Sequence, residues 1–249
     1  MLRGFWKLTW VEIKVFVREP MGVAGSLLIP VVLFVLMGRT IGINAPVVRN
    51  GVARTPPFNV AILAAVLIAI GAVQSLVAII AIYREGGILK RLRATPLSPV
   101  TILGAHVAVK LAFTVVSLLL LVLAGRRLFP GVLQVNVFSF AAALILSTLS
   151  ILSLGFVIAS VVPTARFAQP ISAVVLYPMM ALSGIFVPLE RLPTAVRSVA
   201  QLLPLTHSVA LLQGVWDGTG WGAHWGNVVA LIVIFVCCTA LSTRVFRWE

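Results

Sequence analysis

Long apolar runs separated by short polar segments make up most of the chain. Six of these runs approach the roughly 20 residues that a helix needs to cross a bilayer. They are Met21–Met37, Val60–Ile82, Thr101–Ala124, Val137–Val162, Phe167–Val187 and Gly226–Thr243. The pattern predicts an all-α polytopic membrane protein with six transmembrane helices.

The composition supports this class. Of the 249 residues, 61% are hydrophobic and 10% are charged, whereas soluble domains are about half apolar and a quarter charged. We therefore expect a single membrane domain over residues 1–249. The net charge of +13 would suggest nucleic-acid binding in a soluble protein. Here the cations flank apolar runs, so membrane topology and lipid headgroups account for them better, and we expect no nucleic-acid partner.

The N-terminal segment, residues 1–20, has the pattern of a helix that lies on the membrane surface. Over residues 2–18, basic side chains share one face and Trp, Phe and aliphatic side chains cover the other, as in interfacial helices. Glu12 falls at the edge of the apolar face, which suggests a protein neighbour, and Pro20 ends the helix. The polar positions of this interface helix are Arg3, Lys7, Glu12, Lys14, Arg18 and Glu19.

Lysine and arginine are divided unevenly between the two sides of the predicted spans. Twelve of the 19 fall on the side of both termini and of the loop 83–99, and seven fall on the other. The positive-inside rule places the richer side in the cytosol. The first run lacks the cleavage site of a signal peptide, so we expect the N-terminus to be retained.

The loop YREGGILKRLRATPLSP, residues 83–99, gathers five charged residues between Arg84 and Arg93. Its centre is long enough for about two helical turns, with apolar side chains on one side and cations on the other. Pro96 and Pro99 end this segment because proline cannot continue a helix. By composition alone, the simpler interpretation is a positively charged loop that only fixes topology.

The connection between the last two runs, Pro188 to Trp225, is unusually apolar for a loop. Helical spacing predicts one short helix over residues 193–203 and a second that Thr206 caps and that extends through Val215. Each is too short to cross a bilayer. We therefore predict a re-entrant hairpin over residues 188–216, joined at Pro204, although an ordinary external loop remains the alternative. Its positions of interest are Pro188, Glu190, Arg191, Pro193, Pro204 and Thr206.

The sequence lacks the common signatures of catalysis and of bound cofactors. It contains no GxxxxGK[ST] nucleotide loop, HExxH, CxxC or Asp-rich cluster, and its two cysteines, Cys237 and Cys238, are adjacent in an apolar run. Ser183 and His207 are a weak candidate for a hydrolase pair because the serine lacks a GxSxG context. We expect no catalytic residue, no metal and no cofactor bound by this chain.

All six acidic residues lie outside the predicted spans, so the chain lacks the intramembrane carboxylate that ion-coupled carriers commonly use. His106 and Lys110 are the candidate intramembrane pair. We interpret them as a basic pair that extends to the headgroups near the start of its span. The set of spans, the cationic loop and the missing energy source together favour a transporter subunit that is driven by a partner.

Three stretches of the sequence resemble a known family. The loop YREGGILKRLRATPLSP (83–99), the stretch LSGIFVPLERLP (182–193) followed by LPLTH (203–207), and Arg18-Glu19-Pro20 closely resemble the corresponding segments of ABC-2 type permeases. These are the membrane subunits of ABC exporters. The segment ATPLSP is most similar to the corresponding segment of the daunorubicin-type group of drug or lipid exporters.

The resemblance implies a coupling helix in the 83–99 loop, seated in a cleft of a separate ATP-binding subunit that carries ATP and Mg²⁺. It also implies two such subunits, a second permease chain that is identical or related, surrounding membrane lipids, and a bacterial plasma (inner) membrane. The function would be export of a hydrophobic or amphipathic substrate such as a drug, lipid, glycolipid or polyketide. An ATP-independent channel or lipid-handling transporter is the alternative. The implied ATPase contacts are Arg84, Glu85, Gly86, Gly87, Leu89, Lys90, Arg91, Leu92, Arg93, Thr95, Pro96 and Leu97.

Overall fold

The computed structural model describes residues 2–18, 24–37, 39, 47–49, 52–54, 60–87, 99–128, 136–162 and 164–245. The helical elements are α1 (Leu2–Arg18), η1 (Ala24–Leu28), α3 (Ile29–Met37), α4 (Val60–Ile70), η3 (Gly71–Ser75), α5 (Leu76–Glu85), α7 (Pro99–Leu128), α8 (Val137–Val161), α9 (Ala165–Leu182), η4 (Leu189–Arg191), α10 (Thr194–Ala200), α11 (Pro204–Trp216), α12 (Gly220–Ala223) and α13 (Trp225–Val245). The described fold is almost entirely helical, as predicted.

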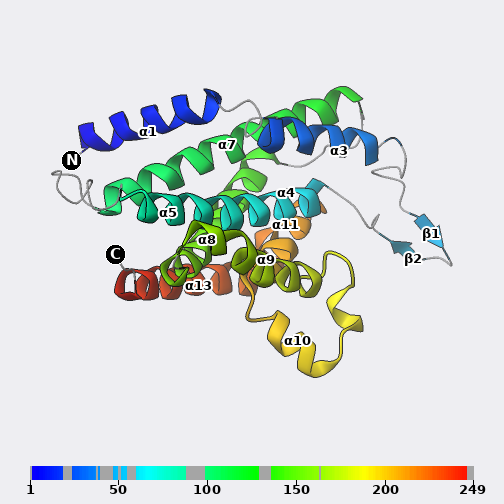
Figure 1. Ribbon diagram of the computed structural model, residues 1–249. Coiled ribbons are helices and arrows are strands. Elements are labelled where there is room, and N and C mark those ends of the chain that lie inside the picture. Colours follow the sequence, from blue (N-terminus) through cyan, green and yellow to red (C-terminus); the bar gives the residue numbers. More distant parts are fainter. Residues whose placement is uncertain are drawn as a thin grey trace.

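One small sheet departs from the all-α expectation. Strands β1 (Val47–Arg49) and β2 (Val52–Arg54) pair antiparallel, with Arg49 opposite Val52. They project from one end of the helical bundle (Figure 1).

Helical segments occupy the positions of all six predicted runs, although they do not all have the properties of a span. In the described part of the chain, four are long and apolar enough to cross a membrane: Ala61–Glu85, Gly104–Leu121, Val137–Val161 and Trp225–Val245. A fifth is counted if α10 and α11, which meet at 84°, form one broken span. In contrast, α3 has nine residues and α9 contains Pro170 and Pro178. The count of six spans therefore stays a prediction.

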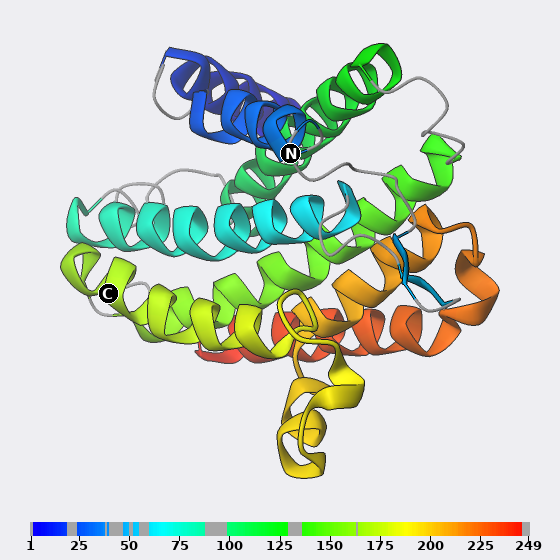
Figure 2. The same cartoon turned by 90° about the vertical axis from the view of Figure 1, so that its right-hand side faces the viewer.

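The helices form two layers, which Figure 1 and Figure 2 show from two directions. Helices α1 and α3 pack on α7 in one layer, and α4–η3–α5, α8, α9, α11 and α13 pack together in the other. The second layer contains most of the hydrophobic core, including the fully buried Phe140, Leu144, Leu176 and Leu211. Contacts among Phe34, Leu63 and Leu121 join the layers.

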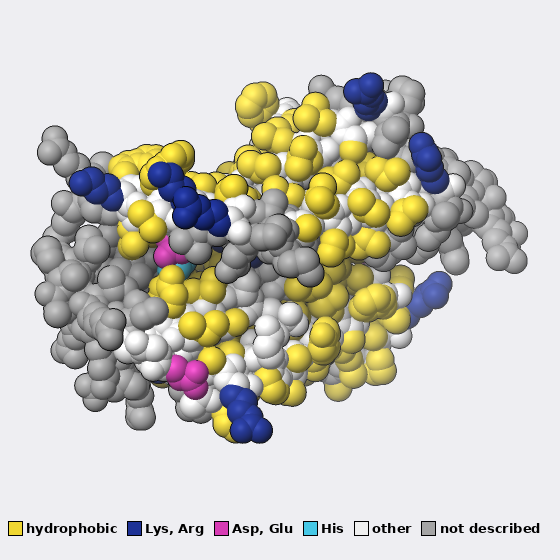
Figure 3. Space-filling model, turned by 45° about the horizontal axis from the view of Figure 1, so that its top comes forward, with side chains coloured by type: hydrophobic (Ala, Val, Ile, Leu, Met, Phe, Trp, Pro, Cys, Tyr) yellow, Lys and Arg dark blue, Asp and Glu magenta, His cyan; other side chains and the backbone are white. Residues whose placement is uncertain are grey.

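The two ends of the bundle differ, and each is named here by the segment found there. At the loop end α5 ends, α7 begins and α8 turns into α9, while α10, α11 and α12 lie toward the opposite, hairpin end (Figure 1). Between these ends, Figure 3 shows a broad hydrophobic face, with Lys and Arg side chains gathered toward its margins. Exposed side chains such as Leu123, Val174 and Val236 fit a surface that faces lipid.

Two helices that meet at 84° occupy the predicted hairpin. Its re-entrant position stays a prediction, and its predicted cap is wrong. Helix α11 begins at Pro204, with Leu203 as its N-cap residue. Proline is favoured at the first helical position because its missing N–H needs no partner there, and the helix therefore starts two residues before Thr206. The two halves are also unequal: α11 is largely buried and packs against α4, α8 and α13, whereas α10 is mostly exposed.

Candidate functional site

The candidate coupling loop is described only at its start. Helix α5 ends at Glu85, and Gly87 adopts a φ of +65°, a left-handed conformation that glycine tolerates at a helix C-terminus. Glu85 and Gly86 are exposed there. The other predicted ATPase contacts lie outside the described residues: Leu89, Lys90, Arg91, Leu92, Arg93, Thr95, Pro96 and Leu97.

Arg84 contacts the end of a neighbouring helix. Its guanidinium donates to the carbonyl of Val162 at 2.5 Å and to that of Ala159 at 3.2 Å. These carbonyls belong to the C-terminal turn of α8, where unpaired acceptors and the helix dipole favour a cation. Arg84 therefore joins the C-terminal ends of α5 and α8 at the loop end of the bundle, a role that the sequence did not suggest.

Glu12 has the protein neighbours that its position in the sequence predicted. Its Oε1 accepts a hydrogen bond from the Tyr83 hydroxyl at 3.0 Å, and its Oε2 lies 3.7 Å from Nδ1 of His106. The Tyr83 and His106 rings meet edge to face, with centroids 5.3 Å apart. Helix α1 is thus joined to α5 and α7 through one carboxylate.

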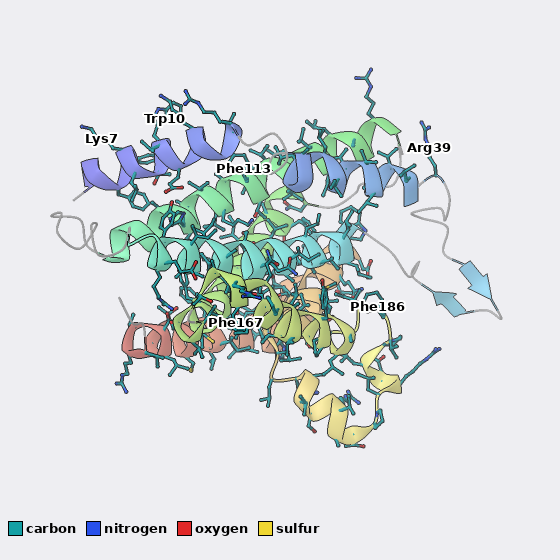
Figure 4. All side chains as sticks on the ribbon, viewed as in Figure 1. Lys7, Trp10, Arg39, Phe113, Phe167 and Phe186 are labelled. Carbon is teal, nitrogen blue, oxygen red and sulfur yellow. The ribbon has the colours of Figure 1, made fainter. Side chains whose placement is uncertain are left out.

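The described basic residues of α1 face outward. Lys7, Lys14 and Arg18 are exposed, Lys14 lies over the Trp10 ring at 5.5 Å, and Lys7 and Trp10 point away from the bundle (Figure 4). This basic and aromatic surface fits an interfacial helix. The side chain of Arg3 and the whole of Glu19 lie outside the described residues.

Lys110 corrects the interpretation of the His106–Lys110 pair. Its Nζ turns inward and donates to Ser75 Oγ at 2.9 Å, so the side chain does not extend to a headgroup. Ser75 in turn donates to the carbonyl of Gly71. These two residues belong to η3, a π-helical segment in the middle of a predicted span, and such segments are frequent at functional sites.

Two cavities have Lys110 in their lining. The larger, of about 370 Å³, lies between α4–η3 and α7, and the smaller, of about 280 Å³, lies between α5 and α7 beside Glu12, Tyr83 and His106. Ser75, Lys110 and Phe113 line both. Phe113, labelled in Figure 4, extends from α7. Both cavities thus lie between the two layers, and Lys110 is part of the lining of each.

The predicted hairpin residues fall into two groups. Pro188, Glu190, Arg191 and Pro193 are exposed on and around η4. Pro204 and Thr206 are buried in α11. Phe186, just before this segment, is also exposed (Figure 4).

A polar network at the hairpin end was missed from the sequence. Asn227 Oδ1 lies 2.9 Å from His207 Nδ1, and Asn227 Nδ2 lies 3.3 Å from His224 Nδ1. His224 Nε2 is 3.1 Å from Thr219 Oγ1, whose hydroxyl donates to the Gly214 carbonyl at 2.8 Å. No short motif identifies this network, because single polar residues of α11, of the two caps of α12 and of α13 form it.

Neither a hydrolase pair nor a metal centre forms among the described residues. Ser183 donates to the Met180 carbonyl at 2.8 Å, and the second ring nitrogen of His207 lies 2.8 Å from the Gln201 carbonyl. No group of three His, Cys, Asp or Glu side chains there could hold a metal ion.

Comparison with known proteins decides the family. The model of the ABC-2 type transporter family matches residues 3–216. The chain belongs to this family. As an ABC-2 permease it is an integral membrane protein, and its resemblance to this family is confirmed.

Relatives of this ABC-2 permease include two named bacterial proteins. The inner membrane transport permease YhhJ of Escherichia coli is 28% identical over 153 residues, 61% of this chain and 41% of the relative. Nodulation protein J of Rhizobium leguminosarum bv. viciae is 33% identical over 100 residues, 39% of each chain. The matched part thus spans about two fifths of the length of these relatives.

Proposed function

We propose that this chain is the membrane-spanning permease subunit of an ATP-driven exporter, which moves a hydrophobic or amphipathic substrate across the inner membrane. The observation that carries the proposal is the family match over residues 3–216, because it includes the N-terminal helix, the cationic loop and the hairpin. Permeases of this family associate in general with ABC ATP-binding subunits. We propose two such subunits, carrying ATP and Mg²⁺, and a second permease chain.

The loop joins two helices that line the smaller cavity. Residues 86–98 connect α5 to α7, and these helices are opposite walls of the smaller cavity. A partner that pulls on the loop would therefore change the separation of the walls. Glu12 ties α1 to both walls, so a partner that contacts α1 would act on the same place. The partner drives the chain only as far as it prefers one of its conformations.

The topology that suits this mechanism has six spans, with both termini and the loop in the cytosol. Four described helices meet the requirements of a span, and the bent pair α10–α11 is compatible with the proposed re-entrant hairpin as well as with a broken span. The basic surface of α1 would face anionic headgroups and the partner ATPase. The hairpin would close the outer side of the path.

The test is to purify the tagged chain in mild detergent from its own cells and identify the proteins bound to it. We expect a stoichiometric ATP-binding subunit. It should be lost from the variant Lys90→Ala/Arg91→Ala/Arg93→Ala, together with ATP-dependent transport in vesicles. The control Arg126→Ala/Arg127→Ala/Arg197→Ala removes the same charge from the other predicted side and should retain the subunit.

Two results would contradict the proposal. The loop assignment is wrong if transport and binding survive in the loop variant. A wild-type chain that repeatedly purifies alone and intact would indicate an ATP-independent channel or lipid-handling transporter.

A further inference from the structure

We propose that Lys110 binds the acidic headgroup of a single-chain amphiphile whose apolar part occupies the larger cavity. The inference rests on the proposed transport of an amphipathic substrate. It adds that the substrate is acidic and that its headgroup contacts Lys110. It is carried by three observations on described residues: the hydrogen bonding of Lys110, the cavities that it lines, and the glycine that lies beside its ammonium group.

The ammonium group of Lys110 has donors to spare. It carries three N–H donors, and among the described residues its hydrogen bond goes to Ser75 alone. The Ser75 hydroxyl donates to the Gly71 carbonyl, so its oxygen accepts the hydrogen bond from Lys110. Lys110 lines both cavities, so its remaining donors are available to a ligand there, and a carboxylate or phosphate oxygen is the acceptor that a cation prefers.

Among the described residues, the ammonium group of Lys110 also has no carboxylate as a counter-ion. The nearby carboxylate, Glu12, is hydrogen-bonded to Tyr83 and pairs with His106. A lysine within a membrane-spanning segment is costly and marks a functional site unless it is paired. An acidic ligand would supply the missing charge.

The larger cavity suits the apolar part of such a ligand. Its volume of about 370 Å³ lies within the range of small-molecule sites. Leu67, Ile68, Leu118 and Leu121 contribute to an apolar lining, and a few polar groups such as Gln74 and Ser117 interrupt it. A single charged group in a largely apolar lining favours an amphiphile over a sugar.

Gly71, which lies beside the end of the Lys110 side chain, leaves room for it because glycine has no Cβ atom. A Cβ atom added at Gly71 would lie 2.9 Å from Lys110 Nζ and 3.0 Å from its Cε, closer than such contacts normally come. On the other side, the smaller cavity contains His106, whose buried Nε2 has no hydrogen-bond partner among the described residues. A ligand that enters past His106 would thus meet a second polar atom before Lys110.

The experiment compares two photoactivatable probes, a long-chain fatty acid with a diazirine on its alkyl chain and the methyl ester of the same acid. The full chain is placed in nanodiscs of phosphatidylcholine, and labelled peptides are mapped by mass spectrometry. We expect the acid to label α4 and α7 peptides at least about tenfold more than the ester, because hydrogen bonds to charged groups contribute about 1.5–3 kcal/mol. Lys110→Met should abolish this preference.

Two further variants control for charge and for folding. Lys110→Arg keeps a cation and should retain the preference, and Lys14→Met removes an exposed cation of α1 and should change nothing. Equal labelling by acid and ester in the wild type, or an unchanged preference in Lys110→Met, would overturn the proposal. The contrast between the two wild-type probes decides this even if a variant fails to fold.

Competition separates the two sources of an acidic headgroup. Excess phosphatidylglycerol in the nanodisc should leave the labelling unchanged if the site takes a single-chain acid. Displacement of the probe would assign the site to a structural membrane lipid and overturn the proposal. Because the assay needs neither ATP nor a partner subunit, its failure would leave the exporter function standing. Loss of the ATP-binding subunit in the purification would in turn leave this site standing.

Discussion

The polar clusters at the two ends of the bundle are built in opposite ways. At the hairpin end, His207, Thr219, His224 and Asn227 lie close together in the sequence and contact one another or nearby carbonyls. From the loop end inward, Glu12, Tyr83, His106 and Lys110 come from distant parts of the chain and line the smaller cavity, and Lys110 also lines the larger one. The first cluster largely uses up its hydrogen-bonding groups, whereas the second keeps donors beside open space.

The difference separates a structural role from a ligand-binding role. A buried polar network in which each group has a partner specifies one arrangement and resists change. A charged group that is held by one bond beside a cavity can exchange partners at little cost. The same type of substitution should therefore lower the stability of the protein at the hairpin end and alter ligand binding at Lys110.

The largest effect on stability is expected for Gly214→Ala. The new Cβ atom would lie 2.0 Å from His224 Nε2, so the ring must leave and give up its contacts with Thr219 and Asn227. Leaving such groups unpaired costs about 2–3 kcal/mol, and the Tm in detergent should fall by about 5 °C. Gly222→Ala is the control because nothing lies within 4 Å of its added Cβ atom. Equal Tm values for the two variants would show that the network has no structural role.

A smaller loss of stability, confined to α1, is expected for Tyr83→Phe. The change removes the hydroxyl that donates to Glu12 and should cost about 1 kcal/mol. Hydrogen exchange should quicken in α1, with little change in the core helices, because this bond joins α1 to α5. Tyr177→Phe, at an exposed position, is the matched control. Unchanged exchange in α1 would mean that apolar packing alone holds this helix.

Gly71→Ala should change binding rather than stability. Its Cβ atom would meet the end of the Lys110 side chain, which is flexible and can move away at small cost. We expect a Tm within about 1 °C of the wild type and a reduced preference for the acidic photoprobe over its ester. A large fall in Tm with normal labelling would reverse the roles that we assign to the two clusters.

The sequence predicted the parts of the fold that depend on local pattern. Apolar runs marked the helices, and the position of Glu12 on an amphipathic helix indicated a protein neighbour, which Tyr83 and His106 provide. It did not predict the inward turn of Lys110, because nothing in the sequence of α7 shows that η3 places Ser75 opposite it. The hairpin-end network was missed for the same reason: its members are ordinary single residues until α11 and α13 pack together.

The smallest effect tests electrostatics within the hairpin end itself. Burial raises the pKa of Asp217, and the charge of His224 lowers it by less. The carboxylate also sits at the C-terminus of α11, where the helix dipole disfavours negative charge. A raised pKa in the folded state gives stability that is fully present below the unfolded pKa and is lost as the pH rises through the folded value. Asp217→Asn should therefore raise the Tm by about 1 °C at neutral pH, since the side chain keeps contact with solvent, and the gain should vanish in acid. Glu190→Gln, an exposed carboxylate in the same hairpin, should show no such trend, and a gain that persists in acid would rule out this electrostatic cause.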